Sequence, residues 1–218
     1  GEGHTVTNDG AITAKDYAVG MKANAGAAAV NNKDKTITVN GTQAVGMSAA
    51  TTADKTTTLT NNGTITVTDG TGISVTGDGE AQIAFGEAGT MTVADRKTGI
   101  KVEGAGTTTV TGGDITVNGM SAGIDGRGYT GKLTVDKTKI SVATGTGIFA
   151  DGNAELKDIA ITLTNNGNGV GINYNGKNSK ATAKISTSDI NLSENGIMGI
   201  VAVLSDQADS KLDIETGK

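Results

Sequence analysis

Residues 113–124 read GDITVNGMSAGI and contain a unit that recurs through the whole chain. Its first half, ITV at 115–117, alternates apolar and polar residues, which is the two-residue period of a strand with one buried face. The pair Asn118-Gly119 tolerates positive φ and therefore predicts a turn. The segment AGI at 122–124 predicts a second short strand. The unit is thus two strands joined by a turn.

Relatives of this unit return with a glycine about every 24 to 28 residues, a period typical of solenoids, propellers and arrays. The glycine and its aliphatic partner are Gly20-Met21, Gly46-Met47, Gly72-Ile73, Gly99-Ile100, Gly123-Ile124, Gly147-Ile148, Gly171-Ile172 and Gly199-Ile200. A third strand is expected before each pair, as at 58–60 and 109–111. Three strands per period predict coils with three faces, stacked at about 4.8 Å so that equivalent strands pair in parallel. The predicted fold is all-β, a three-sided parallel β-helix (β-solenoid) of about eight coils over residues 1–218.

The composition agrees with a solenoid and disfavours other repeat folds. The chain has 34 Gly, no Pro and 2% aromatic residues, so the core must be thin and aliphatic. Helical repeats need long runs at helical spacing, and propeller blades need about 40 to 50 residues each. Neither pattern is present. Because one coil buries few large side chains, we expect its stability to depend on neighbouring coils.

Charge and motifs narrow the possible partners. The 23 acidic residues outnumber 18 Lys and Arg, the net charge is −5, and no basic run occurs, which argues against nucleic acid. No apolar run is long enough to span a bilayer, so this segment is not expected to insert into a membrane. No spacing typical of a metal or cofactor site appears, and we predict none.

One outward face is predicted to carry short hydroxyls. The residue between the two inward aliphatics of the ITV strand is Thr13, Thr38, Thr66, Thr92, Thr116, Ser141, Thr162 and Asn191 in successive coils. In three neighbouring coils the pattern becomes Thr-x-Thr, at Thr36/Thr38, Thr64/Thr66 and Thr90/Thr92. A flat double row of Thr resembles the ice-binding surface of β-helical antifreeze proteins. Thr is also an ordinary residue for the exposed side of a strand.

Catalysis by paired acids has little support in the sequence. Polysaccharide lyases on β-helices use outward acids and a Lys or Arg, which makes Asp114, Lys139 and Asp189 the obvious trio. They fall in one column but in different coils, with the outer two roughly 14 Å apart, too far to share one metal ion. No nucleophile motif is present. We therefore predict that the chain is not an enzyme, and keep a polysaccharide lyase or hydrolase as the alternative and an ice-binding protein as the third possibility.

The iterated phrases, such as NGTITV at 62–67 followed by Gly72-Ile73, resemble the passenger domains of bacterial type V autotransporters, in particular the large fusobacterial adhesins. This resemblance implies a right-handed β-helix, secreted across a Gram-negative outer membrane and displayed at the cell surface, where it serves adhesion and virulence. It also implies that residues 1–218 are one continuous piece of a longer passenger domain.

The resemblance implies an adhesin, or an adhesin stalk, in cell–cell or host attachment. The partner would be a host or bacterial surface protein or glycan, or another copy of the protein. Binding is expected on turns, and the candidate contacts are Arg127, Tyr129 and Tyr174, because Arg and aromatic residues anchor interfaces. Residues 126–129 and an insertion at 173–180 are predicted to be exposed turns that carry them.

Overall fold

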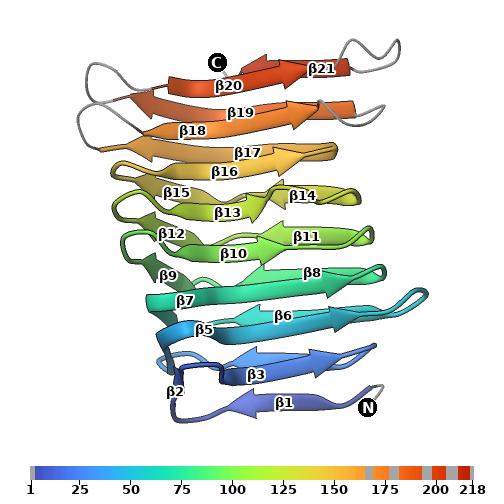
Figure 1. The fold of residues 1–218 in the computed structure, drawn as a ribbon, viewed down its shortest axis with the longest axis vertical. Coiled ribbons are helices and arrows are strands. Elements are labelled where there is room, and N and C mark those ends of the chain that lie inside the picture. The colour runs from blue at the N-terminus through green and yellow to red at the C-terminus, as the bar shows by residue number, and fades with distance from the viewer. Residues whose placement is uncertain (1–2, 165–168, 177–181, 193–197, 205–210, 217–218) are drawn as a thin grey trace.

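The computed structural model describes residues 3–164, 169–176, 182–192, 198–204 and 211–216. These residues contain strands and no helix, and the strands pair in parallel as a β-solenoid of about seven turns. Figure 1 shows the strands stacked as a rod with β1 near one end and β20 and β21 at the other. The predicted fold class, a parallel β-helix, is confirmed. The described residues contain no helix long and apolar enough to cross a membrane.

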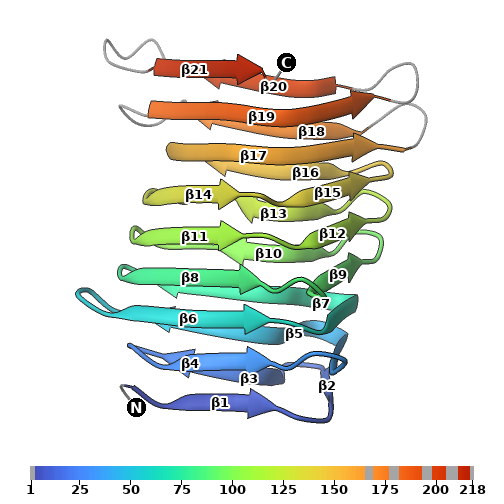
Figure 2. The ribbon, with the colours of Figure 1, turned by 180° about the vertical axis from the view of Figure 1, so that it is seen from behind.

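Three ladders of paired strands run along the rod. The first ladder, visible in Figure 2, consists of β1 (Thr5–Asn8), β4 (Ala28–Asn31), β6 (Thr56–Asn61), β8 (Glu80–Phe85), β11 (Thr107–Thr111), β14 (Lys132–Asp136), the first parts of β17 (Asn153–Leu163) and β19 (Thr182–Leu192), and β21 (Lys211–Thr216).

The second ladder consists of β2 (Ala11–Lys15), the first parts of β5 (Thr36–Thr51) and β7 (Thr64–Gly77), β9 (Thr90–Val93), β12 (Asp114–Val117), β15 (Lys139–Val142), and the last parts of β17 and β19.

The third ladder consists of β3 (Val19–Asn24), the last parts of β5 and β7, β10 (Thr98–Val102), β13 (Ala122–Gly126), β16 (Thr146–Asp151), β18 (Val170–Gly176) and β20 (Met198–Leu204). The chain visits the first, second and third ladders in turn within each coil.

Aliphatic side chains stack in register inside the rod. In the third ladder the inward column is Met21, Met47, Ile73, Ile100, Ile124, Ile148, Ile172 and Ile200. Ile124 in its middle is fully buried, whereas Ile200 is only partly buried. In the second ladder Ala14 stands in the column that Val39 and Val67 occupy in the next coils. The predicted inward register is therefore confirmed.

The recurring glycine is required by the contact between coils. A Cβ at Gly123 would lie 2.6 Å from the carbonyl oxygen of Gly147, and a Cβ at Gly147 would lie 2.6 Å from that of Gly171. Both distances are too short for a real side-chain carbon. Any other residue would push adjacent coils apart, which explains why glycine returns once in each coil beside the aliphatic residue.

A buried asparagine column at the end of the first ladder was not predicted. Asn8, Asn31 and Asn61 occupy equivalent positions in successive coils and are almost completely buried. The Nδ2 of Asn8 donates to Oδ1 of Asn31 at 2.8 Å, and the Nδ2 of Asn31 donates to Oδ1 of Asn61 at 2.7 Å. Each amide thus satisfies its neighbour, which makes its burial tolerable. Phe85 takes the same position in the next coil and ends the column.

Candidate functional site

Arg127 begins the turn between β13 and β14 and is held in a fixed orientation. Its Nε and Nη2 donate to the carboxylate of Asp125 at 2.8 and 2.6 Å, a bidentate pair. Its guanidinium carbon also lies 4.3 Å from the ring centroid of Phe149 in the next coil, within the range of a cation–π contact. The Arg127 side chain is 59% exposed, whereas that of Asp125 is 9% exposed. A fixed, accessible guanidinium is therefore presented to solvent.

Tyr129 lies in the same turn but is buried, so the prediction that this turn exposes it was wrong. Its side chain is 2% exposed, and its hydroxyl donates to the carbonyl oxygen of Gly106 at 2.6 Å. The hydroxyl also lies 3.2 Å from Oγ1 of Thr108. Burial raises the pKa of Tyr129, and the hydrogen bond with Thr108 opposes this effect in part. The ring folds inward because its apolar surface and its hydroxyl both find partners there.

Tyr174 is also a core residue. It lies inside β18, where an exposed insertion was predicted, and its side chain is fully buried. Its hydroxyl donates to the carbonyl oxygen of Gly152 at 2.8 Å. Tyr174 stands between Ala150 and Ala202 in its column, so the ring fills space that these smaller neighbours leave. Of the three predicted contact residues, only Arg127 presents its side chain at the surface.

Arg127 and Phe149 line a surface hollow of about 400 Å³ at the corner between the second and third ladders. The turns from β9 to β10, from β12 to β13 and from β15 to β16 form this corner in three successive coils. We call it the cationic hollow, because its lining includes Arg96, Lys97 and Arg127 and no carboxylate. The remaining lining residues are Thr98, Met120, Ser121, Ala122, Thr144, Gly145, Thr146 and Phe149.

Hydrogen bonds between adjacent coils hold the turns around the cationic hollow in place. Asp95 accepts a hydrogen bond from the backbone N–H of Met120 at 2.7 Å. Ser121 accepts from the backbone N–H of Lys97 at 3.1 Å and donates to the carbonyl oxygen of Ala94 at 2.6 Å. These bonds tie the turn between β9 and β10 to the turn between β12 and β13, and the backbone N–H of Thr146 donates to the carbonyl oxygen of Ser121 at 2.8 Å. The hollow is therefore preorganised, with Met120 63% exposed at its rim.

The outward face of the second ladder carries the predicted threonines in register. Thr38, Thr66 and Thr92 align in one column, and Thr36, Thr64 and Thr90 align in the other. We call these six residues the threonine face. Their side chains are exposed or half-buried, and the hydroxyls of Thr64 and Thr90 lie 3.3 Å apart. The second column continues with Asp114 and Lys139, so the uncharged double row ends there as predicted.

The two aspartates and the lysine considered for catalysis do not converge. Asp114 is directly opposite Lys139, but Ala160 separates Lys139 from Asp189 in the same column. Among the described residues, no group of three His, Cys, Asp or Glu side chains is placed to hold a metal ion.

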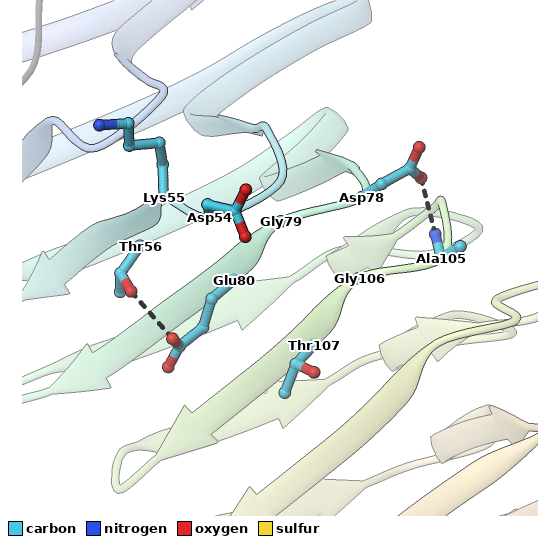
Figure 3. A pocket seen from close by; sticks show the side chains of 9 residues that line it. All are labelled: Asp54, Lys55, Thr56, Asp78, Gly79, Glu80, Ala105, Gly106 and Thr107. Carbon is cyan, nitrogen blue, oxygen red and sulfur yellow. Dashed lines mark hydrogen bonds between the residues drawn. The ribbon is translucent and has the colours of Figure 1, made fainter.

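A second hollow, of about 680 Å³, lies where the third ladder turns into the first, and its lining includes Asp54, Asp78 and Glu80 (Figure 3). Glu80 accepts hydrogen bonds from Gln82 and Thr56, each at 2.8 Å, and these lower its pKa. Asp78 accepts from the backbone N–H of Ala105 at 3.2 Å. Glu80 is thus ionised at neutral pH and is no proton donor. Sequence analysis does not identify this hollow, because its three acids come from two different coils.

Comparisons of the chain with protein-family models, with curated proteins and with solved structures find no match to it. Any inference about function therefore rests on the structure of the chain itself.

Proposed function

We propose that this chain is a segment of a cell-surface adhesin of the autotransporter type, which projects from a Gram-negative cell and binds a partner through its turns. The observation that carries the proposal is the continuous parallel stack. Each described strand in its interior pairs with the equivalent strands of the coils on both sides, as for β10 between β7 and β13. Such a rod places distant turns at fixed positions along its length, which suits display and contact.

The surface of the rod supports binding better than catalysis. The described carboxyl groups with a clearly shifted pKa are Asp69, Glu80, Asp125 and Glu155, and in each the pKa is lowered. A general acid working near neutral pH needs a raised pKa. The hydrolase or lyase alternative would require the hollow lined by Asp54, Asp78 and Glu80 to bind Ca²⁺, which calorimetry with CaCl₂ can test.

The threonine face favours a second candidate, an ice-binding protein. Its six threonines are aligned in two columns, and the residues between the columns, Ile37, Ile65 and Met91, are uncharged and buried. Measurement of thermal hysteresis with the purified protein decides this candidate: a hysteresis gap supports it, and freezing behaviour like that of buffer removes it.

The adhesin proposal is tested by measuring the binding of the purified, fluorescently labelled protein to intact bacterial and mammalian cells. Saturable binding that unlabelled protein displaces is the expected result. Binding that does not saturate, or no binding to any cell type, would contradict an adhesive role for this segment.

A further inference from the structure

We propose that the cationic hollow is a binding site for an acidic glycan, a sugar chain that carries a carboxylate. The inference rests on the proposed function, because it names the ligand class of the adhesin. It starts from the contrast between the hollow and the rest of the chain. The protein has a net charge of −5, yet three cations and no carboxylate line this hollow. The hollow therefore offers an anion oriented cationic N–H donors, each with its counter-ion set outside the lining, rather than an excess of positive charge.

The counter-ions of the three cations lie outside the lining. Arg127 pairs with Asp125, Lys97 with Asp69, and Arg96 with Asp95. A guanidinium has five N–H donors, and the pair with Asp125 uses two of those of Arg127. Asp125 therefore orients the guanidinium of Arg127 and leaves several of its N–H donors free. The remaining donors can form charge-assisted hydrogen bonds with the carboxylate of a ligand.

The other lining groups suit the body of a sugar. Thr98 and Thr144 add hydroxyls that can exchange hydrogen bonds with sugar hydroxyls, while Phe149 and Met120 supply apolar surface for the C–H face of a ring. The volume of about 400 Å³ lies within the usual range of small-ligand pockets. A mixed lining of this kind fits a sugar with one charged group better than a bare inorganic anion.

An acidic peptide fits the corner less well. Extended peptides commonly gain affinity by adding a strand to a free sheet edge. Here β10, β13 and β16 are each paired on both sides, to β7 and β13, to β10 and β16, and to β13 and β18. No edge is free beside the hollow for backbone pairing. A glycan needs no such edge, because it binds through hydroxyls, its ring face and its charge.

The test is titration of the full chain with 3′-sialyllactose, and with neutral lactose as the matched probe, followed by NMR or calorimetry. We expect 3′-sialyllactose to bind at least tenfold more tightly than lactose and to weaken as salt rises. Arg96→Gln should reduce this binding severalfold. Because the Arg96 side chain is 72% exposed, its loss should leave the fold intact. Lys132→Gln removes an exposed cation on the first ladder and serves as the control.

Arg127→Lys is the second variant, because it keeps the charge but loses the bidentate geometry. We expect it to reduce the binding of 3′-sialyllactose at least tenfold while circular dichroism is unchanged. Equal affinity for the acidic and neutral sugars, or full binding by both Arg variants, would overturn the inference. If the variants lose sugar binding but the wild-type protein still binds cells, both the site and the adhesin proposal stand. Cell binding without any acidic-sugar binding would remove only the site.

Discussion

The threonine face and the cationic hollow meet at the coil of β9 and differ in how they are built. On the threonine face each residue stands on an equivalent residue of the next coil, as Thr38, Thr66 and Thr92 do. In the hollow, Arg96, Met120 and Phe149 come from three successive coils and have no like neighbour. Stacked identical residues continue the register of the ladder from coil to coil. A corner made of unlike residues leaves donors and apolar surface for a partner, so departures from the repeat are the places to seek recognition.

The largest effect is expected when the repeat is broken on its inward side. Ile124→Asp buries a charge with no partner in the middle of the rod and should cost several kcal/mol, enough to open the central coils. Thr116→Asp, on the outward side of the same coil, should change the free energy of unfolding by less than about 0.5 kcal/mol. Urea unfolding followed by circular dichroism measures both. Equal stability of the two variants would mean that the register is shifted by one residue.

A smaller loss of stability is expected when an added side chain pushes two neighbouring coils apart. Gly147→Ala places a Cβ 2.6 Å from the carbonyl oxygen of Gly171 and should cost about 1–3 kcal/mol through overpacking. Gly10→Ala is the matched control, because a Cβ there has no heavy atom within 4 Å. Thermal melting of the pair should lower the Tm of the first variant only. A wild-type Tm for Gly147→Ala would show that the coils can separate at little cost.

The asparagine column tests whether a polar repeat stabilises as an aliphatic one does. Asn31→Ala removes the middle amide and leaves the amides of Asn8 and Asn61 without their partner, which should cost about 1–3 kcal/mol. Asn24→Ala, at an exposed position, should be close to neutral. Chemical denaturation distinguishes them, and a neutral Asn31→Ala would mean that water replaces the lost amide.

The smallest effect concerns the ion pair that holds Arg127. Burial raises the pKa of Asp125, but the hydrogen bonds and charge of Arg127 outweigh it, so the pKa in the folded state is lowered. A lowered pKa stabilises the fold above the unfolded value of about 3.9, and this contribution is lost as pH falls through the folded value. Melting from pH 6 to pH 2 should therefore show a smaller acid-induced loss in Asp125→Asn than in the wild-type protein. Identical pH profiles would show that the pair contributes nothing to stability.

The sequence was sufficient for the fold because the repeat is itself the packing pattern. The glycine beside each aliphatic residue follows from the contact between coils, so reading one unit predicted the inward columns and the threonine face. The tyrosines could not be placed in the same way. Tyr129 and Tyr174 depart from the repeat, and their inward direction depends on carbonyl partners at Gly106 and Gly152 in the preceding coil. The hollow was missed because its three turns are about 24 residues apart in the chain.

The most direct test of the account is the binding of three proteins to intact cells, side by side. These are the wild type, a face variant with Thr38, Thr66 and Thr92 replaced by Ser, and a corner variant with Arg96→Gln and Arg127→Lys. The account predicts that the face variant binds as the wild type does and that the corner variant loses most of its saturable binding. Loss of binding by the face variant, with full binding by the corner variant, would contradict it.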